Sequence, residues 1–216
     1  TEVDIAVTQD LVGKGIGWVS KEHATTEGTT VFLPPAVDQY PTKEENFGWY
    51  KVMSTHQVAH IEFGSFDFSF DREAHLFPDS WRNALAARRK DGHATTTELE
   101  RFFDLVEDRR LVADIFTAVE DTRIDCQVKA EYPGIRETYR RVQDEALAER
   151  PDIQALAPRE ALVEYLVRLS LDADGQARDQ FPPDVTSLLQ KMADIAAVVR
   201  SLEARVEDSA EATLRL

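Results

Sequence analysis

The sequence contains a single cysteine and few basic residues, and each shortage excludes a class of protein. Because Cys126 has no second cysteine to pair with, no intrachain disulfide can form, which is typical of a reducing compartment. Lys and Arg total 25 against 40 Asp and Glu, which gives a net charge of −15. So acidic a surface argues against binding to nucleic acid or to an anionic membrane. It suits a soluble cytoplasmic protein, or one with a basic protein partner.

Other familiar signals are also missing from the sequence. No apolar run approaches the roughly 20 residues that would span a bilayer, and no signal peptide is visible, so we expect no membrane insertion. Neither a G-x-S-x-G nucleophile elbow nor a Walker A phosphate loop occurs. The first residue is Thr1 rather than Met, so we expect the chain to be a piece of a longer protein.

The remaining pattern predicts one domain over residues 1–216, mainly α-helical with a small β element at the N-terminus. Residues 1–41 are predicted to form extended structure and turns, because a β-rich stretch at residues 29–33 is stopped by two prolines. Residues 42–216 have the apolar spacing of helices. Thr42 is predicted to cap the first helix and Gly64 to end it.

Further helices are predicted over residues 97–131, over 135–148, from 158 onward, and from about 184 through 206. The last of these carries apolar residues at alternating steps of four and three. That series fits packing against the domain's own core, and it also fits a coiled-coil partner; its members are Leu188, Met192, Ile195, Val199, Leu202 and Val206.

Two histidines on the first predicted helix form the strongest chemical signal. His56 and His60 stand four residues apart, so their imidazoles project from successive turns and can reach one metal ion. A zinc site needs at least one more protein ligand. The other histidines lie in turn-rich or irregular surroundings and are expected to be solvated; these are His23, His75 and His93.

The predicted third ligand is Glu120, which falls on or beside the apolar face of the helix over residues 97–131. A carboxylate there needs a compensating cation or metal, and Arg123 is the alternative partner. Asp121 and Asp125 lie one turn apart on another face of the same helix. We expect them to orient metal-bound histidines by accepting hydrogen bonds.

The residue after His56 decides what such a metal site can catalyse. In the peptidase motif H-E-x-x-H that position holds a glutamate, which activates the metal-bound water. Here it is Gln57, whose amide cannot accept a proton at neutral pH. Glu62 is a poor substitute, because it lies on another side of the helix unless the helix ends at Ala59 or His60. The sequence therefore predicts a degenerate zincin-like helical core, with Gln57 beside the metal rather than a base.

Four stretches of the chain resemble a known family. They are the run from Ser54 to Phe66 (STHQVAHIEFGSF), the run from Ile115 to Asp125 (IFTAVEDTRID), the YPGI at residues 132–135 and the VEDSA at residues 206–210. Together they resemble the region that precedes the von Willebrand A domain in NorD/CbbO-like proteins. The likeness covers residues 45–216 in patches.

This resemblance implies a function in protein assemblies. NorD/CbbO-like proteins are associated with activation of nitric oxide reductase or Rubisco, and they work with a MoxR-type AAA+ ATPase that remodels a client enzyme, often a metalloenzyme. The chain lacks the Asp-x-Ser-x-Ser signature of the von Willebrand A domain. It would then be the other part of a larger adaptor protein.

Three hypotheses follow from the sequence. The first is a non-catalytic adaptor domain with a zincin-like core, with zinc as the candidate ion. The second is a zinc-dependent metallopeptidase-like hydrolase with an unorthodox base, for which Glu62 is the candidate. The third is a structural helical domain in which His56, Glu120 and Arg123 form a buried polar network.

Overall fold

The computed structural model describes residues 4–7, 25–27, 30–87, 97–171, 178 and 180–216, and within them the fold is mainly α-helical, as predicted. None of the helices in these ranges is long and apolar enough to cross a bilayer. The helices are α1 (Lys43–Glu62), α2 (Trp81–Ala86), α3 (Glu98–Phe103), α4 (Arg109–Glu131), α5 (Arg136–Ala148), α6 (Pro158–Leu171), α7 (Thr186–Val198) and α8 (Val206–Arg215). Between them lie the 3-10 turns η2 (Pro133–Ile135), η3 (Ile153–Ala155) and η5 (Pro183–Val185).

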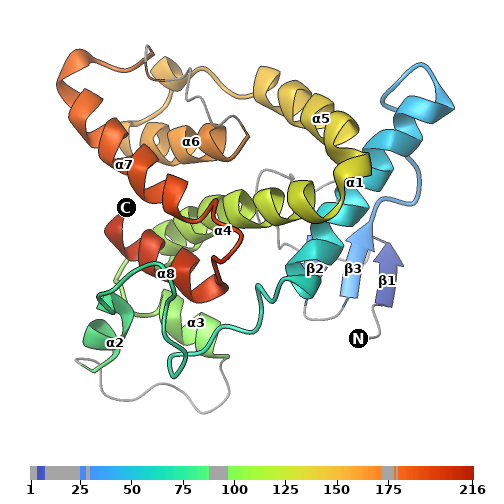
Figure 1. The fold of residues 1–216 in the computed structure, drawn as a ribbon. Helices are drawn as coiled ribbons and strands as arrows, with labels where there is room; N and C mark the ends of the chain where they lie inside the picture. The colour runs from blue at the N-terminus through green and yellow to red at the C-terminus, as the bar shows by residue number, and fades with distance from the viewer. Residues whose placement is uncertain (1–3, 8–24, 28–29, 88–96, 172–177, 179) are drawn as a thin grey trace.

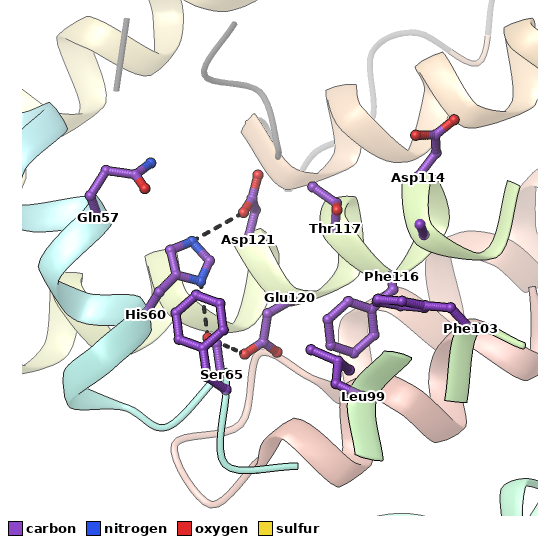
Figure 2. Close-up of a pocket in the computed structure, with 12 residues that line it drawn as sticks. Gln57, His60, Ser65, Leu99, Phe103, Asp114, Phe116, Thr117, Glu120 and Asp121 are labelled. Atoms are coloured by element: carbon purple, nitrogen blue, oxygen red, sulfur yellow. Dashed lines mark hydrogen bonds and ion pairs between the residues drawn. The ribbon is translucent and has the colours of Figure 1, made fainter. Parts of the chain in front are cut away.

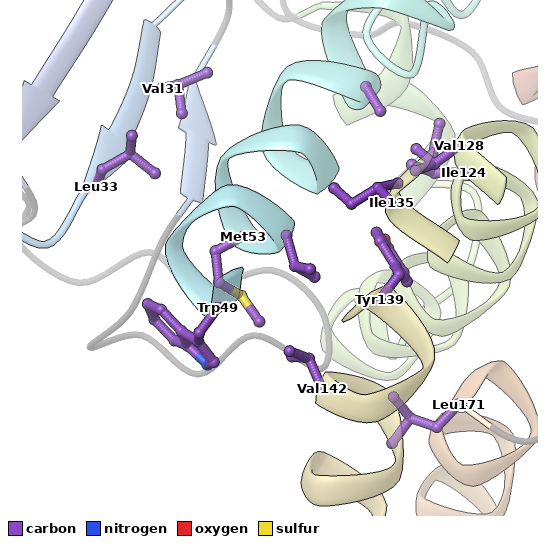
Figure 3. Packing of buried hydrophobic residues seen from close by; sticks show 12 residues of the cluster. Val31, Leu33, Trp49, Met53, Ile124, Val128, Ile135, Tyr139, Val142 and Leu171 are labelled. Carbon is purple, nitrogen blue, oxygen red and sulfur yellow. The ribbon is translucent and has the colours of Figure 1, made fainter. Parts of the chain in front are cut away.

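A three-stranded sheet lies beside α1 (Figure 1). Its strands are β1 (Asp4–Val7), β2 (Thr25–Glu27) and β3 (Thr30–Leu33), in the order β1-β3-β2. β3 pairs in parallel with β1 and antiparallel with β2. Two side chains of β3, Val31 and Leu33, are buried in one hydrophobic cluster with Trp49 and Met53 of α1. Figure 3 shows this packing on the strand side of α1.

Helix α4 runs through the middle of the molecule and contacts α1, α3, α6 and α8 (Figure 1). Because neighbours surround it, all side chains from Ala118 to Asp125 are buried. Four of those eight side chains are charged, namely Glu120, Asp121, Arg123 and Asp125. Buried charges are stable only when they are paired or bind a metal, so the surroundings of α4 are where a functional site is expected.

The two ends of α1 are fixed as the sequence predicted. At the N-terminus, the Thr42 side chain accepts a hydrogen bond from the Glu45 backbone N–H, and the Glu45 side chain accepts one from the Thr42 backbone in return. At the C-terminus, Gly64 has a φ of 71°, a left-handed conformation that favours glycine. The helix therefore continues past His60, and the chain turns sharply just before Ser65.

Two predicted helices are interrupted in the structure. The helix over residues 97–131 is divided into α3 and α4, because the Asp108 side chain accepts a hydrogen bond from the Leu111 N–H and starts a new helix. The prediction of a single helix from residue 184 through 206 was also wrong, since α7 ends at Val198 and α8 begins at Val206. Leu188 and Leu202 are exposed, so the apolar residues spaced four and three apart do not form one continuous buried face.

Helix α8 carries three fully buried carboxylates that hold the segment between α1 and α3. Glu207 accepts hydrogen bonds from the Ser69 backbone and the Arg72 side chain. Asp208 accepts from the Leu76 backbone at 2.6 Å. Glu211 accepts from the Trp81 backbone at 3.0 Å, and it lies beside the guanidinium groups of Arg82 and Arg215. We call Glu207, Asp208 and Glu211 the α8 acidic cluster.

Candidate metal centre

Three buried side chains from two helices bring potential metal ligands to one point. His56 and His60 of α1 place their Nε2 atoms 3.3 Å apart. Oδ1 of Asp121, on α4, lies 3.6 Å from Nε2 of His56 and 3.5 Å from Nε2 of His60. Figure 2 shows the His60 ring and the Asp121 carboxylate facing each other. We call these three residues the His-His-Asp triangle, and they could hold a metal ion.

The outer nitrogen of His56 is held by a second layer of polar groups. Its Nδ1 lies 2.9 Å from Oδ1 of Asp125 and 2.8 Å from the Tyr139 hydroxyl. Tyr139 also donates to Asp125. Gln143 donates to the other Asp125 oxygen at 2.6 Å. A carboxylate at Nδ1 favours the tautomer with the proton on that nitrogen, which leaves the Nε2 lone pair for a metal.

The outer nitrogen of His60 is held in a parallel way. Its Nδ1 lies 2.9 Å from the Ser65 hydroxyl, which in turn donates to Oε1 of Glu120 at 2.5 Å (Figure 2). Because the Ser65 hydrogen is directed to Glu120, the Ser65 oxygen is left to accept the Nδ1–H of His60. Both histidines thus aim Nε2 at the centre of the triangle.

The sequence predicted Glu120 beside the two histidines, and the structure places Asp121 there instead. Both Nε and Nη2 of Arg123 donate to Glu120, and the ion pair is buried. Arg123 is therefore the partner of Glu120, and Asp121 stands with the histidines instead. Successive residues of a helix point about 100° apart, so only one of these two carboxylates can face α1 directly. Asp125, one turn beyond Asp121, is the carboxylate that orients His56.

The buried charges shift one another's ionisation. Burial lowers the pKa of His56, but hydrogen bonds and charges from Asp121 and Asp125 outweigh it and raise that pKa to about 10. Burial raises the pKa of Asp121, yet the hydrogen bonds from His56 and His60 bring it below its usual range. Burial likewise raises the pKa of Glu120, and Arg123 reverses this and lowers it. Without a metal, a proton on His56 therefore supplies the positive charge that the triangle needs.

The two residues considered for catalysis occupy very different places. Gln57 is buried and lines the same cavity as His60 and Asp121 (Figure 2). Glu62 is exposed and accepts a hydrogen bond from the Tyr132 hydroxyl at 2.7 Å. Since α1 continues to Glu62, the early helix end that would turn this carboxylate toward the histidines does not occur.

A cavity of about 140 Å³ adjoins the His-His-Asp triangle. Its polar end is formed by Gln57, His60, Ser65, Glu120 and Asp121, and its other walls are mainly apolar. Phe103 and Phe116 meet there edge to face, with ring centroids 5.4 Å apart. Figure 2 shows these rings on the far side of Glu120 from His60.

Three residues of the site were missed in the sequence. Ser65 follows Gly64, and the turn at that glycine is the signal that could have placed it beside His60. Tyr139 and Gln143 lie one turn apart on α5. The sequence indicates only that they share the buried face of an amphipathic helix, and not that they reach His56. Of the remaining histidines, His75 is about half exposed, as predicted, whereas His23 and His93 lie outside the described residues.

No family model, curated protein or solved structure matches this chain. The case for its function therefore rests on the geometry of the His-His-Asp triangle and on the residues around it.

Proposed function

We propose that this chain is a zinc-binding domain with a zincin-like core, which lacks peptidase activity and serves as a protein-binding adaptor. The main observation in favour of a metal ion is the set of distances between the three ligand atoms of the triangle. A tetrahedral zinc ion with bonds of about 2.0–2.1 Å has ligand atoms about 3.3–3.4 Å apart. The three distances here are 3.3, 3.5 and 3.6 Å.

The second layer of groups supports the same proposal. Zinc-binding histidines almost always donate their other N–H to a carboxylate, carbonyl or water, and His56 has Asp125 in that place. His60 reaches Glu120 through Ser65. Two histidines four apart on one helix, with a carboxylate from a second helix, is also the ligand arrangement of zincin-type sites.

The lack of a suitable base argues against a peptidase. Of the described carboxylates that line the cavity, Asp121 belongs to the triangle and Glu120 is held by Arg123. The third, Asp114, is exposed and lies nearly two helical turns from Asp121. Gln57 occupies the position of the catalytic glutamate, so the domain keeps the metal without the proton acceptor.

The resemblance to NorD/CbbO-like proteins supports the adaptor role. Two of the resembling stretches, residues 54–66 and 115–125, contain both histidines and the buried charged residues of α4, namely Glu120, Asp121, Arg123 and Asp125. In this proposal the zinc ion joins α1 to α4, and the acidic surface contacts a MoxR-type AAA+ ATPase or its client enzyme.

Metal analysis of the purified chain tests the zinc site. We expect about one zinc per chain in the wild type and a loss of most of it in His56→Ala and in Asp121→Ala. His75→Ala is the matched control, because His75 is exposed and outside the triangle. Wild-type protein without bound metal after reconstitution with zinc would refute the site.

Binding and turnover measurements test the adaptor role. We expect the chain to alter ATP hydrolysis by a MoxR-type ATPase of the same organism, and to leave casein uncut. Casein cleavage that a chelator abolishes would instead establish the hydrolase hypothesis. No effect on the ATPase would refute the adaptor role while leaving the zinc site intact.

A further inference from the structure

The cavity beside the triangle suggests what else the metal binds. Three protein ligands leave one position of a four-coordinate zinc ion to a molecule that is not part of the chain. Among the residues that the structure describes, His56, His60 and Asp121 form the group that could hold an ion. The cavity begins at two of them, His60 and Asp121.

The walls of this cavity determine the kind of molecule that fits. Beyond the polar end, they are formed mainly by the side chains of Phe66, Leu99, Phe103, Ala113 and Phe116, and Asp114 and Thr117 line the cavity as well. Four of the five apolar residues come from two helices that pack together, α3 and α4. The apolar part of the wall offers no hydrogen bonds, so the part of a ligand that contacts it is hydrocarbon.

The volume of the cavity sets the size of the molecule. At about 140 Å³, it is close to a cavity of roughly 150 Å³, lined by apolar side chains, that is known to bind benzene. One side is bordered by Phe66, which is 37% exposed, so the cavity has a wall at the molecular surface. A ring of six carbons or a short alkyl chain therefore fits, with its head group at the triangle.

We propose that the cavity is a binding site for a small monocarboxylate, whose oxygen binds the zinc ion and whose short alkyl or aryl body fills the apolar walls. This inference rests on the proposed zinc site. Gln57 and Thr117 line the cavity near Asp121, and their side-chain donors are suited to the second carboxylate oxygen. The site would thus bind the carboxylate group through the metal, and the size of the cavity would select the alkyl or aryl group.

Cobalt-substituted protein allows metal binding and carboxylate binding to be measured separately. The full chain is loaded with Co²⁺, whose visible spectrum reports the coordination of the ion, and is titrated with acetate, butyrate and benzoate. Each methylene buried is worth roughly a fourfold gain in affinity. We expect butyrate and benzoate to bind on the order of tenfold more tightly than acetate, which carries the head group alone.

Variants of the wall test where the body binds. Ala113→Leu fills the cavity, so it should remove the preference for butyrate and benzoate over acetate while cobalt still binds. Ala197→Leu, an exposed alanine of α7, is the matched control and should keep the preference. Leu99→Ala enlarges the cavity and should preserve or increase the preference for benzoate, which keeps the test valid if the leucine variant fails to fold.

The outcomes separate the two proposals. If cobalt does not bind, both the zinc site and the carboxylate site are refuted. If cobalt binds with a four-coordinate spectrum but the three carboxylates bind equally, or Ala113→Leu leaves their preference unchanged, only the carboxylate site is refuted.

Discussion

Two buried clusters of charge, the His-His-Asp triangle and the α8 acidic cluster, are stabilised in opposite ways. In the α8 acidic cluster, carboxylates accept hydrogen bonds from the backbone and from arginines of the chain itself. In the triangle, two Nε2 atoms and a carboxylate oxygen converge instead, and all three are acceptors when the histidines are neutral. The first cluster carries its own cations, and the second requires one from solution.

This difference separates a structural network from a site. A chain that only needed buried polar packing would pair its acceptors with donors of its own, as most carboxylate oxygens of the α8 acidic cluster are; Oε2 of Glu207 is the exception. The outer nitrogens of His56 and His60 are supplied in that way, whereas their inner nitrogens face each other and Oδ1 of Asp121, and need a proton or a metal ion between them. The following predictions test the difference, from the largest expected effect to the smallest.

Removing a carboxylate of α8 should destabilise the protein whether or not metal is present. Glu211→Ala leaves Arg82, which is fully buried, without its ion-pair partner. We expect the free energy of unfolding to fall by about 3–5 kcal/mol, the usual cost of breaking a buried pair. Urea denaturation with and without a chelator measures this. Glu203→Ala is the control, since Glu203 is 74% exposed and should cost less than about 1 kcal/mol.

Removing metal should destabilise only through the triangle. With free zinc about 1,000-fold above its dissociation constant, binding adds about 4 kcal/mol to the free energy of unfolding. We expect a chelator to abolish that increment in the wild type and to have no effect on Asp121→Ala. Equal sensitivity of the two proteins to the chelator would show that the metal binds elsewhere.

The metal-free protein should lose stability as the pH rises. Because the pKa of His56 is raised from 6.5 to about 10, its proton stabilises the folded chain. This contribution is fully present below pH 6.5 and is lost as the pH rises toward 10. Between pH 6 and 9 we expect the free energy of unfolding in a chelator to fall by about 3 kcal/mol, with allowance for coupling to Asp121.

The zinc-loaded protein is the control for this pH dependence, because the ion replaces the proton on His56. Its stability should change far less over the same range. A metal-free protein that becomes more stable between pH 7 and 9 would contradict the assignment of that proton.

The smallest predicted effect concerns the support of His60. Ser65→Ala removes the hydroxyl between His60 and Glu120, and losses of this kind lower metal affinity about 10- to 100-fold. Competition with a chromogenic chelator measures the change. Ser54→Ala is the control, because the Ser54 hydroxyl lies outside the triangle and its supports and donates to a backbone carbonyl of its own helix. An unchanged zinc affinity in Ser65→Ala would show that the hydrogen bond from His60 to Ser65 does not contribute to metal binding.

The sequence predicted local features well and relations between helices less well. The cap at Thr42, the turn at Gly64 and the shared face of His56 and His60 depend on neighbours within a few residues. The choice between Glu120 and Asp121 depends on how α4 is rotated against α1, and helical periodicity does not determine that rotation. Tyr139 reaches His56 from 83 residues away, which no local pattern indicates.

The interruption between α7 and α8 has the same origin. The apolar steps of four and three continue through residues 199–205, and periodicity alone predicts one helix there. In the structure the chain turns, and α8 then packs against α4, where its carboxylates meet the segment of residues 69–82. Burial of those carboxylates with their partners outweighs the continuation of the helix.

Arg123 joins the two clusters into one cooperative unit. Besides Glu120, it donates to the carbonyl oxygen of Phe63 at 3.1 Å, and to that of Ala204, just before α8, at 3.5 Å. One guanidinium thus connects the end of α1, the middle of α4 and the approach to α8. Substitutions in the two clusters should therefore not be additive. A change of charge at the histidines would reach the C-terminal helix through the ion pair of Glu120 and Arg123.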